Sequence, residues 1–146
     1  MGRTMMDAEV LAERGTAIER HLERVAECLP ARPEDLRPMT DASDAVVLHL
    51  WLAVQIAVDL AVHACVRLGL GSPPTYADAF RRLESAGLLD ARLATALVRA
   101  AGFRNVIAHA YEGVDLLRVH AAARSGPADL RALLAKLADR ALRSGS

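Results

Sequence analysis

A long apolar stretch, residues 41–68, restricts the folds open to this chain more than any other feature. Prolines break the chain just before it, and Gly69 and Gly71 follow it, so both of its ends are marked. Its polar exceptions recur every four residues, a spacing that places side chains on one face of an α-helix. Thr40 or Asp41 can cap its first turn. The stretch therefore predicts one long, mostly buried helix against which the other elements must pack.

The composition favours the same architecture for the whole chain. Hydrophobic residues make up 53% of the 146 residues, whereas aromatic residues make up only 3%. A core built from alanine, leucine and valine suits closely packed helices better than a sheet. Alternation typical of a strand is absent over any useful length. We therefore predict an all-α, up-and-down bundle of four to six helices that forms a single domain over residues 1–146.

Apolar periodicity and capping residues predict where the remaining helices lie. Thr75 and Asp78 match a capping box, and Asp90 can cap a further helix. Ser125-Gly126-Pro127 is expected to open a separate last helix. The helices predicted besides 41–68 are 7–29, 75–86, one from Asp90 to about Gly113, a short one over 115–122, and 127–142.

The segment 102–111 (GFRNVIAHAY) is the one place where chemically capable side chains interrupt the apolar pattern at short, fixed spacing. On a helix at ~100° per residue, Asn105 and His109 share a face and Arg104 lies to one side of it. These three groups can converge on one small ligand. Taken alone, the pattern fits either a catalytic site or a structural cluster of polar residues. Gly102 offers a place for a kink in this helix.

This segment resembles the active-site motif of the HEPN superfamily, and specifically that of the HepT toxins. Arg104 is followed directly by Asn105, and His109 is followed after one residue by Tyr111, as in the family pattern. The resemblance covers roughly residues 40–122 and implies a HEPN-like bundle; outside that range only the helical pattern matches. The residues upstream that also resemble the family are Gln55, Asp59, Gly69, Leu70, Pro74, Tyr76, Ala79 and Phe80.

The resemblance implies a metal-independent endoribonuclease that needs no cofactor. A histidine with a pKa of ~6.5 can take and give a proton near neutral pH, and an arginine can hold a phosphate through two parallel hydrogen bonds. His109 would remove the 2′ proton or protonate the leaving 5′ oxygen, while Arg104 would stabilise the phosphoryl charge. Asn105 would orient the imidazole or the RNA substrate.

A homodimer is implied because one histidine per chain leaves the second proton transfer without a donor or acceptor. HEPN proteins pair two motif helices across a two-fold interface, which brings two arginines and two histidines into one cleft. The long apolar helix and the motif helix offer surface for such a contact.

Tyr111 has a separate implied role. The corresponding tyrosine of HepT toxins accepts adenylyl groups from an MntA-like nucleotidyltransferase antitoxin. The added charge and bulk beside Arg104 would occupy the place of the RNA phosphate. The alternative is that Tyr111 only packs its ring against the bundle.

Two other functions remain open from the sequence. The chain could be a non-catalytic helical subunit that binds a nucleotidyltransferase partner, or a plain helical dimerisation module. Intact Arg104 and His109 favour the ribonuclease toxin.

The polar stripe of the 41–68 helix consists of Gln55, Asp59, His63 and Arg67. It is either an edge stripe stabilised by its own neighbours at four-residue spacing, or a surface that faces the motif helix and orients Arg104 or His109. Gln55 and Asp59 are the candidates for that supporting role.

Charge, cysteines and localisation add fewer constraints. The net charge is +0, but residues 90–146 hold nine basic and five acidic residues, so a locally positive cleft can form.

Cys28 and Cys65 lie far apart among apolar neighbours and are expected to be free, buried thiols. His109 has no second ligand at metal-binding spacing. With no signal peptide and no uninterrupted membrane span, we expect a cytoplasmic protein.

Overall fold

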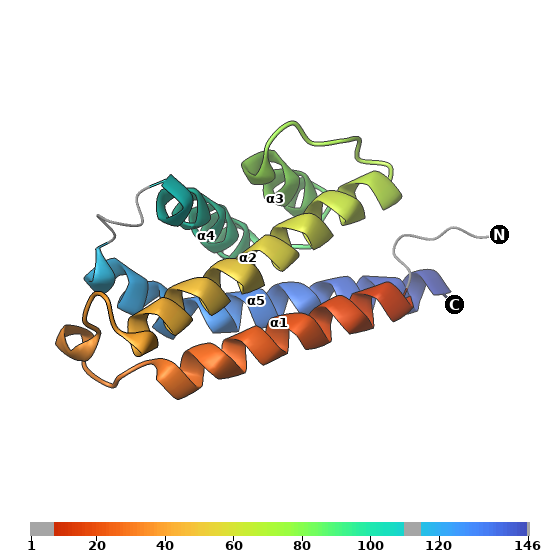
Figure 1. The fold of residues 1–146 in the computed structure, drawn as a ribbon. Helices are drawn as coiled ribbons and strands as arrows, with labels where there is room; N and C mark the ends of the chain where they lie inside the picture. The colour runs from red at the N-terminus through yellow and green to blue at the C-terminus, as the bar shows by residue number, and fades with distance from the viewer. Residues whose placement is uncertain (1–7, 110–114, 146) are drawn as a thin grey trace.

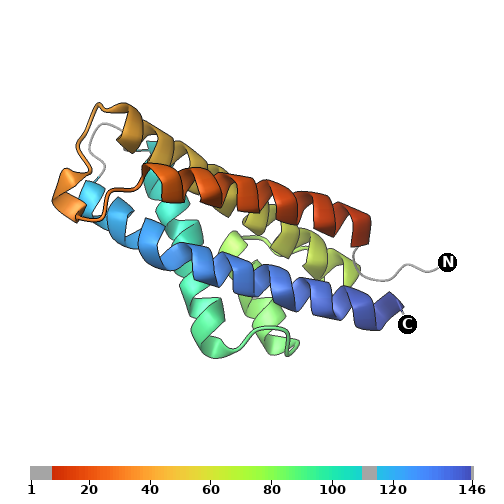
Figure 2. The same ribbon diagram turned by 90° about the horizontal axis from the view of Figure 1, so that it is seen from below.

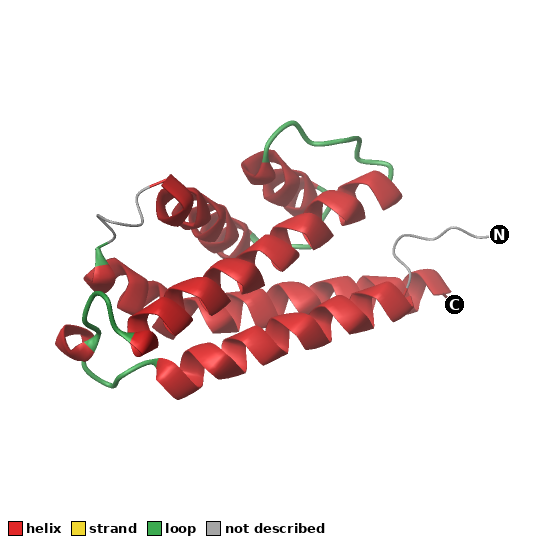
Figure 3. Ribbon diagram, in the orientation of Figure 1, coloured by secondary structure: helices red, strands yellow, loops and turns green. Residues whose placement is uncertain are grey.

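The computed structural model describes residues 8–109 and 115–145, with backbone alone for residues 105–109 and 142–145. All regular structure in these ranges is helical, and no strand is present in them (Figures 1 and 3). The all-α helical bundle predicted from the sequence is therefore confirmed. The elements in chain order are α1 (Ala8–Cys28), the short 3-10 helix η1 (Pro33–Asp35), α2 (Asp41–Arg67), α3 (Tyr76–Ser85), α4 (Ala91–His109) and α5 (Leu116–Gly145).

Three long helices, α1, α2 and α5, form the body of the bundle (Figures 1 and 2). Helix α2 packs against every other α-helix, so it is the central element that its apolar sequence predicts. Helices α3 and α4 lie on the side of α2 away from α1, and α4 also reaches α5 (Figure 1). The motif helix is thus fixed from three directions, by α2, α3 and α5.

Helix α2 is also the one described helix that is long and apolar enough to cross a membrane by length and composition. Half of that apolar window is buried inside the bundle. Burial of this kind is the pattern of a core helix in a soluble protein, because its apolar side chains already have protein neighbours.

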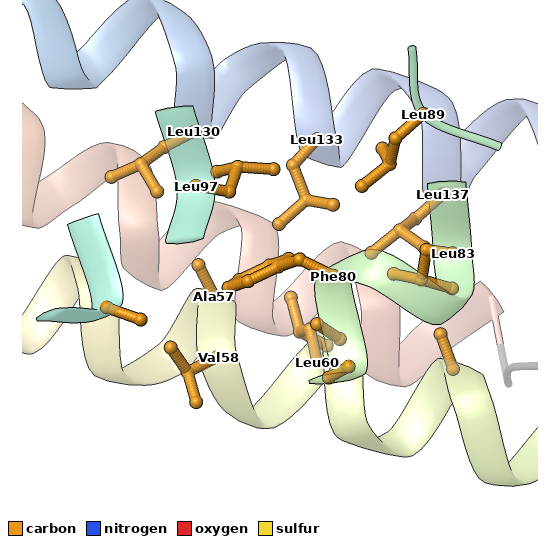
Figure 4. Packing of buried hydrophobic residues seen from close by; sticks show 14 of the residues in the cluster. Ala57, Val58, Leu60, Phe80, Leu83, Leu89, Leu97, Leu130, Leu133 and Leu137 are labelled. Atoms are coloured by element: carbon orange, nitrogen blue, oxygen red, sulfur yellow. The ribbon is translucent and has the colours of Figure 1, made fainter. Parts of the chain in front are cut away.

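Most of the core is one cluster to which all five α-helices contribute (Figure 4). Phe80 of α3 is 1% exposed and lies among leucines and alanines, including Leu97 and Leu133. A second cluster around Val46 and Val119 joins the ends of α1, α2 and α5. Trp51 and Phe103, both half-buried, pack against this second cluster. The indole Nε1 of Trp51 is buried and has no hydrogen-bond partner among the residues that the structure describes.

The predicted helix caps are present. The Thr40 hydroxyl accepts a hydrogen bond from the Ser43 amide, and the Thr40 amide donates one to the Ser43 hydroxyl, so Thr40 rather than Asp41 caps α2. Thr75 accepts from the Asp78 amide at 3.1 Å, and Asp90 accepts from the Leu93 amide at 2.8 Å. Each cap satisfies an amide that the helix itself leaves without an acceptor.

The predicted break at Ser125-Gly126-Pro127 is wrong. Helix α5 runs without interruption from Leu116 to Gly145, with Pro127 inside it. An internal proline costs about 3 kcal/mol, because it removes one hydrogen bond and clashes with an earlier carbonyl. Buried apolar residues on both sides of the proline, Val119 before it and Leu130, Leu133 and Leu137 after it, offset that cost by packing on the same bundle.

Two histidine contacts tie distant segments together. His120 of α5 is 4% exposed, and its Nε2 lies 2.7 Å from the carbonyl oxygen of Pro30, so that nitrogen donates a hydrogen bond to the loop after α1. His21 of α1 and His49 of α2 place their Nδ1 atoms 2.9 Å apart, with ring centroids 5.2 Å apart. One of these two nitrogens must donate and the other accept. Both contacts join segments that are distant in the sequence.

The His21–His49 contact predicts a loss of stability on acidification. Burial, and then the charge of His49, lowers the pKa of His21 below its ordinary value of 6.5. The unfolded chain therefore binds more protons than the folded one below about pH 6.5, so the stabilisation is complete above that pH and is lost as the pH falls. We expect the free energy of unfolding to decrease between pH 7.5 and pH 5.0 by more in the natural chain than in His21→Gln. An equal decrease in both proteins would show that other groups dominate.

Candidate active site

Arg104 lies near the end of α4 and is the described part of the motif with the clearest contacts. Its side chain is half-buried, and Nη1 donates a hydrogen bond of 2.7 Å to Oε1 of Gln55 on α2. The two residues are 49 positions apart in the sequence. The packing of α4 on α2 therefore brings together the motif arginine and the polar stripe of α2.

Tyr76 makes the second contact with Arg104. Cζ of Arg104 lies 4.7 Å from the centroid of the tyrosine ring, within the range of a cation–π interaction. Tyr76 is the first residue of α3, directly after the Thr75 cap, so the start of that helix sets the position of the ring. Gln55 and Tyr76 are both uncharged, and neither contact cancels the charge of the guanidinium.

Gln55 also connects Arg104 to Asp59. Its Nε2 donates a 3.0 Å hydrogen bond to Oδ1 of Asp59, one turn further along α2. The amide orientation follows from the partners, because the guanidinium has only donors and the carboxylate only acceptors. Asp59 is exposed, so this carboxylate anchors Gln55 without being buried itself.

The rest of the polar stripe does not take part. His63 and Arg67 are exposed, and no hydrogen bond or ion pair joins Asp59 to His63 or His63 to Arg67 in the described ranges. The stripe is therefore not held by the neighbour pairs that the edge interpretation expects. Its first member, Gln55, faces the motif helix as the other interpretation requires.

Three motif residues lie wholly or partly outside the described residues. The backbone of α4 continues as helix through Gly102 and up to His109, but the side chains of Asn105 and His109 are not among those described. Tyr111 falls in the undescribed segment, as does the predicted helix end at Gly113. Their roles stay predictions.

Tyr76 is the contact that sequence reasoning missed as a part of the site. In the sequence, Tyr76 was noted only among the residues before the motif that resemble the family. No periodicity relates the first residue of α3 to a residue on α4, so its contact with Arg104 was not predicted. Its position after a capping threonine and beside a proline-containing loop was the available signal for a fixed ring.

The part of the chain with described side chains holds no group of three or more histidine, cysteine or acidic residues placed to bind a metal ion. Cys28 and Cys65 are both free, as predicted, but only Cys65 is fully buried. Its Sγ lies 3.4 Å from the Ala79 carbonyl oxygen, and burial raises the pKa of the thiol. The contacts of Arg104 described above are with the Gln55 amide and the Tyr76 ring, and neither cysteine takes part in them.

Comparison with known proteins relates this arrangement to a family. The model of the HepT-like ribonucleases matches residues 18–137. The mRNA nuclease HepT of Shewanella oneidensis is 30% identical over 73 residues, which are 50% of this chain and 55% of that relative. The matched part thus spans about half the length of the curated relative.

Two solved structures share the fold. One is a toxin–antitoxin complex with AMP-PNP, at 20% identity and a TM-score of 0.80, covering 88% of this chain and 97% of that one. The other is the tri-AMPylated HEPN toxin of Shewanella oneidensis in complex with MNT antitoxin, at 21% identity and a TM-score of 0.80, covering 90% and 98%. At such identities the likeness establishes the fold alone. Together with the family model, which spans most of the sequence, it confirms the resemblance drawn from the motif: the chain belongs to the HepT-like ribonuclease family.

Proposed function

We propose that this protein is the toxin of a toxin–antitoxin pair, an endoribonuclease of the HEPN type. The observation that carries the proposal is the fixed Arg104, held by the Gln55 amide at 2.7 Å and by the Tyr76 ring at 4.7 Å. An arginine that stabilises a transition state must be positioned before the reaction, since reorganisation would cost part of the gain. Family membership and the mRNA nuclease among its relatives support the same activity.

In the proposed reaction the ribose 2′ oxygen attacks the adjacent phosphorus and the bond to the 5′ oxygen breaks. His109 takes the 2′ proton, and a second histidine protonates the leaving 5′ oxygen. The products are a 2′,3′-cyclic phosphate and a 5′-hydroxyl end. Arg104 stabilises the charge that gathers on the phosphoryl oxygens, and Asn105 orients the imidazole or the RNA. No metal takes part in these steps.

The second histidine comes from a second copy of the chain. A two-fold interface between motif helices would place two copies of Arg104 and His109 around one phosphodiester. Each arginine would be held by Gln55 and Tyr76 of its own chain, so the dimer needs no further element to position it.

We propose that a nucleotidyltransferase partner inactivates the enzyme by adenylylating Tyr111. The tri-AMPylated toxin from Shewanella oneidensis, in complex with its MNT antitoxin, supports this regulation. The tyrosine oxygen attacks the α-phosphorus of ATP, and pyrophosphate leaves. Each transferred group adds a negative charge and bulk beside Arg104.

Adenylylation is expected to add mass in AMP units. After incubation of the protein with the partner and ATP, intact mass spectrometry should show this increase, and fragmentation should place it on Tyr111. Tyr111→Phe should stay unmodified and stay active in the presence of the partner. An unchanged mass of the natural chain, with a partner proved active on another substrate, would contradict the regulatory proposal.

Growth and RNA integrity test the function itself. The natural chain and the double variant Arg104→Ala/His109→Ala are induced in parallel in a bacterial host, and total RNA is followed in both. Growth arrest with RNA cleavage in the natural chain alone is expected. If both chains are harmless while well folded and expressed, the protein is instead a helical subunit that binds a nucleotidyltransferase.

Substitution of Gln55 should change kcat more than it changes KM. In Gln55→Ala the guanidinium loses a charge-assisted hydrogen bond, so we expect kcat to fall roughly tenfold with a smaller change in KM. Gln55→Glu keeps an acceptor for Arg104 but adds a negative charge beside it, and kcat should fall at least as far while the melting temperature holds. Asp59→Asn is the control, because asparagine keeps an oxygen that can accept from Gln55, and we expect only a small change in kcat. Full activity of Gln55→Glu would assign Gln55 a structural role only.

A further inference from the structure

A second feature of the motif helix is a groove of about 720 Å³ between α4 and α5, with α2 at its base. This volume is within the range of about 300–1,000 Å³ in which proteins bind small ligands. Small side chains leave the groove open, because Ala96 and Ala100 of α4 lie opposite Ala121 and Gly126 of α5. Leu50 and Val54 of α2 complete an apolar base.

Arginines line this apolar groove. Arg99 of α4 and Arg118 of α5 are exposed, and neither forms an ion pair or hydrogen bond with any residue that the structure describes. Arg92, at the start of α4, pairs with Asp129 at 3.4 Å and so links the two helices at the far end. The groove therefore carries two positive charges that no described carboxylate neutralises.

The groove is close to the motif along the same helix. Arg99 precedes Arg104 by five residues, about 7.5 Å along the helix axis at 1.5 Å per residue. Phe103, directly before Arg104, lines the groove and presents a half-buried aromatic ring. At about 100° per residue, Arg99 and Arg104 also point about 140° apart around the helix, so a strand bound at Arg104 would pass around α4 by way of Phe103 to reach the groove.

We propose that this groove binds single-stranded RNA beside the cleaved bond, with Arg99 and Arg118 on backbone phosphates and Phe103 against a base. The inference rests on the proposed ribonuclease activity and extends it with a binding site. Arginine matches phosphate oxygens through paired donors, and an aromatic ring accepts the face of any base. A site of this composition holds RNA with little dependence on its sequence.

RNA fits the groove better than a protein surface does. A second copy of the chain meeting this groove across a two-fold axis would bring like charges together, which is unfavourable. An acidic partner protein would satisfy the charges, but a partner that modifies Tyr111 needs no further contact along α4, whereas an RNA strand cleaved at Arg104 must continue along the neighbouring surface. Charge complementarity and position therefore both favour RNA as the ligand of the groove.

Binding is tested in a background in which cleavage is expected to be slow. The His109→Ala protein and its groove variant Arg99→Gln/Arg118→Gln are titrated against a fluorescein-labelled single-stranded RNA of mixed sequence, with anisotropy as the readout at several salt concentrations. We expect the groove variant to bind at least tenfold more weakly. The slope of log affinity against log salt should fall by about 1.4, since each phosphate contact on a single strand contributes about 0.7.

Two further variants make the result specific. Arg14→Gln/Arg20→Gln removes the same charge from exposed positions on α1 and should leave the affinity and the slope unchanged. Arg99→Lys/Arg118→Lys keeps the charge and should keep the salt slope of the parent. With His109 intact, the groove variant should show a raised KM and a kcat within about twofold, which cleavage kinetics measure.

Equal affinity and equal salt slope in the groove variant and the α1 variant would overturn the inference, even if the natural chain cleaves RNA. Unchanged RNA binding combined with loss of binding to the nucleotidyltransferase would also overturn it and assign the groove to the protein partner. If the natural chain neither binds nor cleaves RNA, the proposed function fails together with the groove.

Discussion

Purified His109→Ala protein is expected to cleave RNA 10²–10⁴-fold more slowly than the natural chain, because a positioned acid or base contributes a factor of this size. Binding should change little, since the imidazole acts on protons and not on the affinity for the phosphate. The measurement is single-turnover cleavage of a labelled RNA, with dimer mass and circular dichroism recorded on the same samples.

The matched control is His63→Ala, which removes an exposed histidine from α2 away from the Arg104 contacts. It should retain the natural rate. Arg104→Lys is the informative companion, because lysine keeps the charge but cannot reproduce the planar contacts with Gln55 and Tyr76. Cleavage by His109→Ala at the natural rate would show that His109 takes no part in the mechanism.

Phe80→Ala is expected to lower the free energy of unfolding by about 3–5 kcal/mol, the usual cost of removing a buried aromatic side chain. Phe80 is 1% exposed, and leucines from α3, α4 and α5 surround its ring (Figure 4). The close packing of these leucines limits how far they can move into the space that the ring leaves. Urea denaturation followed by circular dichroism measures the change.

Leu48→Ala is the control for this substitution, because Leu48 lies on α2 but is 52% exposed. It should cost well under 1 kcal/mol, in line with surface substitutions. A loss from Phe80→Ala no larger than that from Leu48→Ala would mean that the ring is not part of the packed core.

The helices were largely predictable because their signals are local. Thr40, Thr75 and Asp90 cap the helices that they were expected to cap, since a capping side chain and its amide are only three residues apart. Pro127 misled the prediction for the same reason. A local rule places a break there, whereas buried apolar residues on both sides of the proline pack against other helices of the bundle.

The candidate site was predictable in composition but only partly in geometry. The motif spacing pointed to Arg104, and the four-residue period pointed to Gln55, which the structure places against Arg104. The role of His109 stays a prediction. Tyr76 could not be placed, because its contact depends on how the start of α3 meets α4 across a turn. Contacts between residues tens of positions apart follow from the packing of whole helices, which no short pattern encodes.

The chain contains a single tryptophan, and Trp51 packs against the same cluster as Phe103 of the motif helix, one turn before Gln55. Its indole NH is buried, with no acceptor in the described part of the chain, so its emission depends on nearby dipoles more than on solvent. The fluorescence of Trp51 can therefore report on changes around Phe103, the residue directly before Arg104. Intrinsic fluorescence should register RNA or partner binding in the natural, unlabelled chain, and can follow both events on the millisecond timescale.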